Sequence, residues 1–163
     1  MSSQAKNLSD TGIFGATPIP SRKVAVVFAS WNPEVTYALR DGALLGLSQF
    51  GILPEDQMLI EVPGTFELPL AAQMAIKAGA HGVICIGCVV RGETPHFDYI
   101  CQGVTQGIMQ VGLTEGKPVI FGVLTVNSQE QALDRAGGKH GNKGTEAAVT
   151  LIKMLQNADQ LLA

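Results

Sequence analysis

The 163-residue chain carries a net charge of −3, and 46% of its residues are hydrophobic whereas only 15% are charged. This length suits a single domain, and the lack of a basic run argues against binding to nucleic acid. No apolar stretch reaches the roughly 18 residues that a membrane-spanning helix needs. Because an average domain is about 25% charged, we expect partners to cover part of this apolar surface.

The first segment is polar, contains Pro and Gly, and shows little amphipathic pattern. We expect residues 1–22 to form a flexible N-terminal arm, and one domain to occupy residues 23–163. The stretch 12–20 is a candidate for an edge strand that is added to a neighbouring subunit, although Pro18 and Pro20 would limit its hydrogen bonds. We find no secretory signal in this segment.

Short apolar runs then alternate with segments of helical periodicity. The expected strands cover residues 23–30, 57–62, 82–90 and 118–126. Helical patterns follow them over residues 33–50, after residue 67, over 97–113 and from 128, where Ser128 and Gln131 fit a capping box. A last helix is predicted from the apolar stripe Ala147, Ala148, Leu151, Ile152, Leu155 and Leu162.

Four strands that are each followed by a helix predict a parallel sheet between two helical layers. The fold class is therefore α/β, a three-layer αβα sandwich with a four-stranded parallel sheet and flavodoxin-like topology. Ligands of such sheets bind beyond the carboxyl ends of the strands. Chemically reactive side chains follow three of the predicted strands, at residues 31–32, 65–67 and 91–96. We expect a binding site at this edge.

Three cysteines, Cys85, Cys88 and Cys101, make an odd number, which together with the missing signal favours a reducing, cytoplasmic compartment. Cys85 and Cys88 are three residues apart in an expected strand, so their side chains should point to opposite faces. We interpret both as core residues and not as a metal or redox pair.

His96 follows the most hydrophobic strand and has polar neighbours. An imidazole can accept and donate a proton near neutral pH, so His96 is a candidate acid and base, although a surface-loop histidine would show the same pattern. The only other histidines, His81 and His140, do not give a zinc-type spacing, and we expect no metal.

Residues 135–144, RAGGKHGNKG, combine four cationic or imidazole side chains with glycines. Glycine lets backbone N–H groups approach an anion, and a guanidinium can bind phosphate with two hydrogen bonds. Alternatively, these cations only complement the negative end of the preceding helix. The segment is not a Walker loop, because Lys143 precedes Gly144 and Thr145.

Trp31 is the only tryptophan, and it stands in a loop at the same edge. A flat ring there can stack on a heteroaromatic substrate, or simply pack in an interface. Glu67 can accept hydrogen bonds from substrate hydroxyls, or favour the N-terminus of its own helix.

Taken together, these stretches resemble the 6,7-dimethyl-8-ribityllumazine synthase family. The resemblance rests on Trp31-Asn32, VPGTFELP at 62–69, GCVVRGETPHFDYI at 87–100, PVIFGVLT at 118–125 and EQALDRAGGKHGNKGTEAA at 130–148. It implies the condensation of 5-amino-6-(D-ribitylamino)uracil with 3,4-dihydroxy-2-butanone 4-phosphate, which releases phosphate and water and uses no cofactor.

The resemblance also implies roles for individual residues. Trp31 takes the place of an aromatic that stacks on the pyrimidine and is often phenylalanine in the family, and Phe121 matches an aromatic from a neighbouring subunit. His96, Arg135 and Lys143 are the expected catalytic residues. The expected substrate-binding residues are Trp31, Asn32, Gly64, Thr65, Phe66, Glu67, Val89, Val90, Glu93, Thr94 and Phe121, with Glu93, Thr94 and Arg135 at the phosphate.

Members of the family place each site between adjacent subunits of a pentamer, and twelve pentamers can close into an icosahedral shell. A homo-oligomer with its site at the subunit interface is therefore implied. Two alternatives stay open: a flavin- or phosphosugar-binding module of the same fold, and a non-catalytic shell protein.

Overall fold

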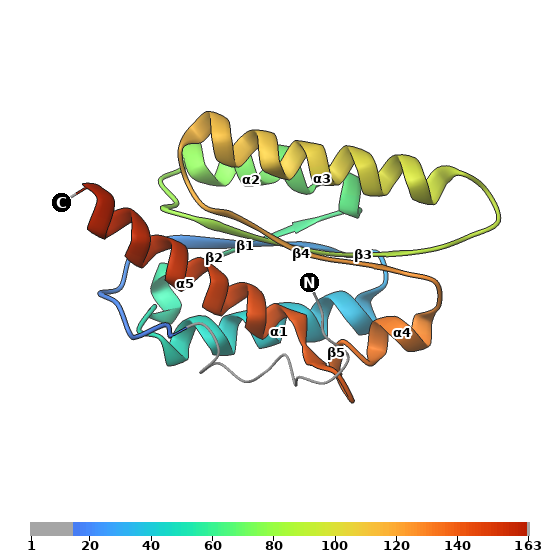
Figure 1. Ribbon diagram of the computed structural model, residues 1–163, viewed down its shortest axis with the longest axis horizontal. Coiled ribbons are helices and arrows are strands. Elements are labelled where there is room, and N and C mark those ends of the chain that lie inside the picture. Colours follow the sequence, from blue (N-terminus) through green and yellow to red (C-terminus); the bar gives the residue numbers. More distant parts are fainter. Residues whose placement is uncertain (1–14, 163) are drawn as a thin grey trace.

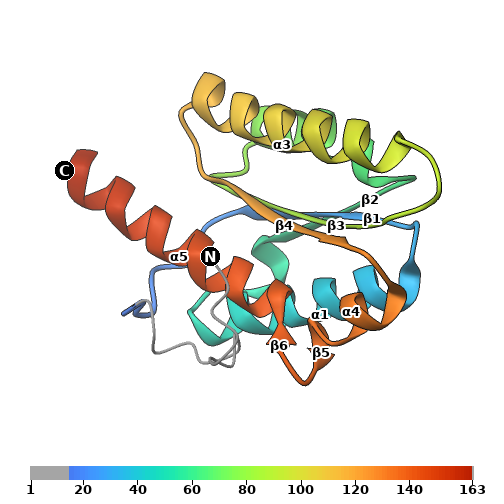
Figure 2. The same ribbon diagram turned by 45° about the vertical axis from the view of Figure 1, so that its right-hand side comes forward.

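The central sheet contains four parallel strands in the order β2-β1-β3-β4. The computed structural model describes residues 15–162 of the chain. The strands are β1 (Val24–Ala29), β2 (Gln57–Val62), β3 (Val83–Val90) and β4 (Val119–Val126). One face is covered by α1 (Pro33–Gln49), α4 (Gln129–Leu133) and α5 (Lys143–Leu162), and the other by α2 (Leu68–Lys77) and α3 (His96–Glu115) (Figures 1 and 2). The predicted three-layer sandwich is confirmed, and this strand order is that of flavodoxin-like folds.

The core lies on both faces of the sheet, because side chains alternate between the faces along each strand. All six residues of β1 are buried, as expected for a strand that helices cover on both sides. Cys85 packs with the α2 and α3 side chains, whereas Cys88 packs with those of α1 and α5. The prediction that these two thiols point to opposite faces is therefore confirmed.

Glycines allow the helices of each layer to approach closely. A Cβ at Gly144 of α5 would lie 1.8 Å from the carbonyl oxygen of Leu39 in α1. On the other face, a Cβ at Gly107 of α3 would lie 2.7 Å from Pro69 of α2. The α5 backbone therefore packs directly on the α1 backbone, and the α3 backbone packs on the ring of Pro69 in α2.

The segment after β4 differs from its predicted form. Ser128 caps α4 by accepting a hydrogen bond from the Gln131 amide, but the side chain of Gln131 accepts from Asn127 and not from Ser128. The predicted polar turn is a short antiparallel hairpin of β5 (Ala136–Gly138) and β6 (Gly141–Asn142). Strands of three and two residues are too short to show a hydrophobic period.

Residues 15–22 of the expected arm contact the rest of their own chain. Ile19 donates its backbone N–H to Phe50 at 3.0 Å, and Gln156 of α5 donates to the Thr17 carbonyl at 2.7 Å. No strand forms in this described part of the arm, and residues 12–14 of the candidate edge strand lie outside the described residues.

The end of α5 projects from the core. Leu162 is 87% exposed, so the predicted apolar stripe of this helix packs only as far as Leu155. Within residues 15–162, no helix combines the length and apolar character that a bilayer crossing demands.

Candidate active site

A cleft of about 520 Å³ opens at the carboxyl edge of the sheet. It lies where the chain order of the strands reverses, between β1 and β3, which is where open α/β sheets bind ligands. The loops after β1, β2 and β3 and the start of α3 form its walls. The lining residues are Trp31, Asn32, Gly64, Thr65, Phe66, Glu67, Cys88, Val89, Val90, His96 and Ile100.

Trp31 presents its ring at the mouth of this cleft. The side chain is 72% exposed, and its backbone N–H is held by the carbonyl of Pro63 at 3.2 Å. The next residue, Asn32, adopts the left-handed conformation with φ 60° and ψ 55°, which asparagine tolerates better than most residues. This turn lets α1 begin at Pro33 while Trp31 stays at the rim.

His96 is the first residue of α3 and is exposed to solvent. The helix therefore begins one residue earlier than the sequence predicts. Glu67 ends the short 3₁₀ turn η3 (Thr65–Glu67) that precedes α2. A Cβ at Gly64 would lie 3.0 Å from a carboxylate oxygen of Glu67, so this glycine leaves the carboxylate room beside the cleft. An imidazole and a carboxylate thus share one cavity with the flat ring of Trp31.

Cys88 is among the residues that line the cleft, but its thiol packs against α1 and α5 and is a weak nucleophile. Burial raises the pKa of Cys88 to about 11 and that of Cys85 to about 12. A thiol reacts as its thiolate, so neither group is reactive near neutral pH.

The predicted residues Glu93 and Thr94 lie in an exposed loop beside the cleft and do not line it. The loop is tied at its start, because Arg91 donates its backbone N–H to the Val126 carbonyl at 2.9 Å. Its end is tied as well, since the guanidinium of Arg91 lies 4.1 Å from the ring centre of Phe97. Backbone and side chain of one arginine therefore hold this loop next to His96.

Three other predicted residues lie away from the cleft. The β5–β6 hairpin brings Arg135 and Lys143 together, because the Lys143 N–H bonds to the Arg135 carbonyl at 2.9 Å. The ammonium of Lys143 forms an ion pair with Glu146, and the guanidinium of Arg135 donates to the Gln131 carbonyl at 2.8 Å. Phe121 stands on the edge strand β4 and is 42% exposed. Within one chain, the predicted site residues are thus divided between two places.

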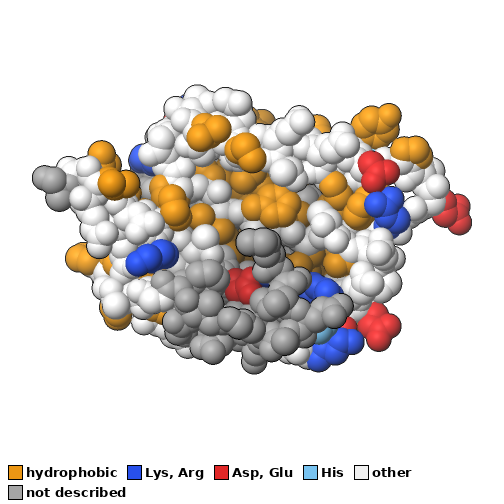
Figure 3. All heavy atoms as spheres, viewed as in Figure 1, with side chains coloured by type: hydrophobic (Ala, Val, Ile, Leu, Met, Phe, Trp, Pro, Cys, Tyr) orange, Lys and Arg blue, Asp and Glu red, His pale blue; other side chains and the backbone are white. Residues whose placement is uncertain are grey.

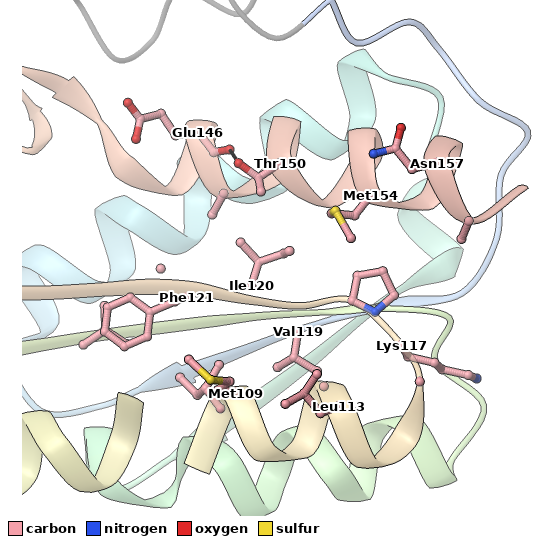
Figure 4. A pocket seen from close by; sticks show the side chains of 18 of the residues that line it. Met109, Leu113, Lys117, Val119, Ile120, Phe121, Glu146, Thr150, Met154 and Asn157 are labelled. Atoms are coloured by element: carbon pink, nitrogen blue, oxygen red, sulfur yellow. Dashed lines mark hydrogen bonds between the residues drawn. The ribbon is translucent and has the colours of Figure 1, made fainter. Parts of the chain in front are cut away.

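Phe121 and Lys143 line a second cavity, a groove of about 890 Å³ between α3, the free edge of β4 and α5. Hydrophobic side chains gather over this region (Figure 3). In Figure 4, Met109 and Leu113 reach into the groove from α3 and Met154 reaches in from α5, on either side of β4. The pair Lys143 and Glu146 gives this apolar groove a polar end.

Comparison with known proteins identifies the family. The family model of 6,7-dimethyl-8-ribityllumazine synthase matches residues 21–159. The chain belongs to this family. A 6,7-dimethyl-8-ribityllumazine synthase of Cytophaga hutchinsonii is 54% identical over 157 residues, which cover 95% of this chain and 98% of the relative. One from Porphyromonas gingivalis is 50% identical over 155 residues, 94% of this chain and 96% of the relative.

The chain lines its cleft with two residues that the sequence did not indicate as site residues, Cys88 and Ile100. Ile100 lies four residues after His96 on α3, so helical spacing places it on the same face and could have revealed it. Cys88 carried no comparable signal, because a strand residue before a functional loop is usually interpreted as core. Among the described residues, no group of three or more His, Cys, Asp or Glu could hold a metal ion.

Proposed function

We infer that the chain is a transferase that condenses 5-amino-6-(D-ribitylamino)uracil with 3,4-dihydroxy-2-butanone 4-phosphate. The product is 6,7-dimethyl-8-ribityllumazine, the penultimate compound of riboflavin biosynthesis, and phosphate and water are released. Family membership over residues 21–159 carries this inference. The cleft supports it, because Trp31, Glu67 and His96 line one cavity at the edge of the sheet where such folds bind ligands.

In this proposal the cleft holds the pyrimidine substrate. Trp31 stacks on the heteroaromatic ring, since a flat exposed indole offers a large apolar surface at the mouth. The backbone of Val89 and Val90 contacts the uracil edge at the end of β3. Thr65 and Glu67 hold the ribityl chain, whose hydroxyl groups can donate hydrogen bonds to the carboxylate.

The phosphate substrate binds beside His96 in the loop that carries Glu93 and Thr94. The phosphate then lies near the N-terminus of α3, where the helix dipole favours an anion. Arg135 supplies a guanidinium for the phosphate, and Lys143 supplies a second positive charge. Because the fold keeps both cations away from the cleft of the same chain, with Lys143 at the groove and Arg135 bonded to it through the backbone, we propose that they reach the cleft from a neighbouring copy.

The reaction begins when the amine of the pyrimidine attacks the ketone and forms an imine with loss of water. Phosphate then leaves by elimination, and the ribitylamino nitrogen attacks the remaining carbonyl carbon, so that ring closure releases a second water. His96 moves protons in these steps, which is worth roughly 10²- to 10⁴-fold in rate. Holding two substrates together contributes several kcal/mol more, so positioning is the larger effect.

An apolar stripe that runs from the η3 turn along α2, called the α2 stripe below, gives the chain a second surface that suits the groove. Phe66, Leu70 and Met74 recur every four residues and are 57%, 65% and 61% exposed. We propose that this α2 stripe of one copy packs into the groove of the next. Two different surfaces then meet at each interface, and repeating such an interface closes a ring when the rotation allows it.

This arrangement accounts for the divided site. Phe66 belongs both to the α2 stripe and to the cleft, so a neighbour that covers the stripe brings its Phe121 to the mouth of the cleft. We propose a pentamer as the ring, and a shell of twelve pentamers as the complete assembly. A cytoplasmic location is part of the proposal, because Cys85, Cys88 and Cys101 are free thiols.

Activity is tested by mixing the purified chain with both substrates and following the absorbance and fluorescence of the lumazine. Arg135→Ala should raise KM for the phosphate substrate by about 10- to 100-fold, as expected when a hydrogen bond between charged groups is lost. Lys139→Ala is the matched control, since Lys139 lies in the same hairpin but pairs with Asp134 at 2.7 Å. An unchanged KM in Arg135→Ala would refute the phosphate assignment, and absence of lumazine from the wild-type chain would refute the function.

A further inference from the structure

Strand β3 extends further than its neighbour β1 at the carboxyl edge of the sheet. The pairing between β1 and β3 ends at Phe28 and Ile86, whereas β3 continues to pair with β4 as far as Val90 and Val126. The last residues of β3 therefore pair with β4 on one side and have no neighbouring strand on the other. This overhang lies at the floor of the cleft.

The backbone N–H and C=O groups of one β3 residue both point toward β1, and those of the next residue both point toward β4. The Gly82 carbonyl accepts from Ala25 in β1, and the Val83 N–H donates to Pro118 before β4. By this alternation the carbonyl of Cys88 points to the β1 side, beyond the point where β1 stops. Cys88 is only 2% exposed, and a buried carbonyl without a hydrogen-bond partner destabilises the fold.

Two side chains take the place of the missing strand. The amide Nδ2 of Asn32 donates to the Cys88 carbonyl at 3.1 Å, and the hydroxyl of Thr65 lies 3.5 Å from the same oxygen. Asn32 belongs to the loop after β1, and Thr65 to the loop after β2. One carbonyl at the end of β3 thus joins the three loops that form the cleft.

Asn32 is well suited to this contact for a second reason. Its left-handed backbone forms the turn between Trp31 and the first residue of α1. A contact that holds the Asn32 side chain therefore also holds Trp31 in place. The bond to Cys88 fixes that turn against β3, directly before Val89 and Val90.

We propose that Asn32 is a positioning residue, which sets the Trp31 ring relative to the end of β3 by bonding to the Cys88 carbonyl, with Thr65 as a weaker second donor. Its effect on the substrate passes through Trp31. The role of Trp31 as a ring platform rests on the proposed function, whereas the bond that holds it belongs to the fold itself.

The chain offers a direct probe, because Trp31 is its only tryptophan. The experiment measures the fluorescence anisotropy decay of Trp31 in the ligand-free full-length protein. Asn32→Asp removes the amide donor but keeps the shape, and aspartate is favoured both at helix N-caps and in the left-handed region. We expect the amplitude of the sub-nanosecond component to at least double, and KM for the pyrimidine substrate to rise about fivefold with a smaller change in kcat.

The control is Ser30→Ala, which removes another side-chain bond from the same loop. The hydroxyl of Ser30 donates to the Pro63 carbonyl at 3.2 Å, and that oxygen keeps the Trp31 N–H as a partner. Ser30→Ala should leave the anisotropy decay unchanged, and Thr65→Val should increase the fast component less than Asn32→Asp does. If Asn32→Asp fails to fold, Asn32→Gly removes the same donor with a backbone that accepts the positive φ.

An unchanged anisotropy decay in a folded Asn32 variant would overturn the proposal, whatever happens to activity. If the decay changes as expected while the wild-type chain makes no lumazine, the proposed function fails and the positioning role stands. A KM that rises while Trp31 stays rigid would assign Asn32 to direct substrate contact and would also overturn the proposal.

Discussion

Replacing Leu70 by aspartate should separate the assembled protein into smaller species, because Leu70 occupies the centre of the α2 stripe. Its side chain is 65% exposed in the single chain. Burying a whole leucine is worth roughly 1.5 to 3 kcal/mol, so covering this exposed part contributes about 1 to 2 kcal/mol to each interface. A carboxylate in the same place also pays several kcal/mol for its lost hydration. The interface should therefore weaken by more than about 100-fold.

Sedimentation velocity measures this directly, since the wild-type chain should sediment as a large oligomer and Leu70→Asp as a much smaller species. The matched control is Leu45→Asp, because Leu45 is 61% exposed but lies on α1, in the opposite helical layer. Leu45→Asp should keep the ring. If Leu70→Asp sediments like the wild-type protein, the α2 stripe is not the surface that enters the groove.

Three further outcomes follow from single side chains. His96→Ala should reduce kcat by no more than about 10⁴-fold in the lumazine assay, and complete loss would mean that proton transfer outweighs positioning. Burial raises the pKa of Cys85 from 9.0 to about 12, so its neutral thiol stabilises the fold below pH 9, and this stability is lost as the pH rises toward 12. In urea titrations between pH 9 and 12, the free energy of unfolding of Cys85→Val should fall less steeply with pH than that of the wild-type chain, by up to about 1.4 kcal/mol per pH unit. The same slope in both proteins would contradict the burial effect. Gly144→Ala should lower the free energy of unfolding by about 3 kcal/mol in the same titrations, because the new Cβ would lie 1.8 Å from the Leu39 carbonyl oxygen. Gly92→Ala is the control and should leave the free energy of unfolding nearly unchanged, because its Cβ would meet nothing within 4 Å.

The strands and the edge that carries the cleft were accessible from the sequence, because the central strands β1 and β3 are apolar throughout and reactive residues follow them abruptly. The step from Val90 to residues 91–96 shows this pattern most clearly. Parallel topology then places the loops after β1, β2 and β3 together, which is why Trp31, Glu67 and His96 line one cavity as expected. The spacing of hydrophobic residues and the order of elements along the chain are therefore enough to predict the sheet and the edge where the cleft lies.

The rest depends on contacts between residues that no local pattern encodes. The bond of Asn32 to the Cys88 carbonyl requires β3 to extend beyond β1, and this offset is a matter of register and not of composition. The β5–β6 hairpin, which joins Arg135 to Lys143, is too short for a period. The separation of these two cations from the cleft reflects how one chain folds, and a single sequence does not state which residues a neighbour supplies.

Complementation between two defective variants tests the shared site most directly. Trp31→Ala damages only the cleft side of an interface, and Arg135→Ala damages only the groove side. Each variant alone should have low activity. When both are expressed in one cell and assemble at random, about a quarter of the interfaces combine an intact cleft with an intact groove, so activity should recover to about a quarter of the wild-type value. Mixed oligomers that remain as inactive as the two parents would contradict a site built from two copies of the chain.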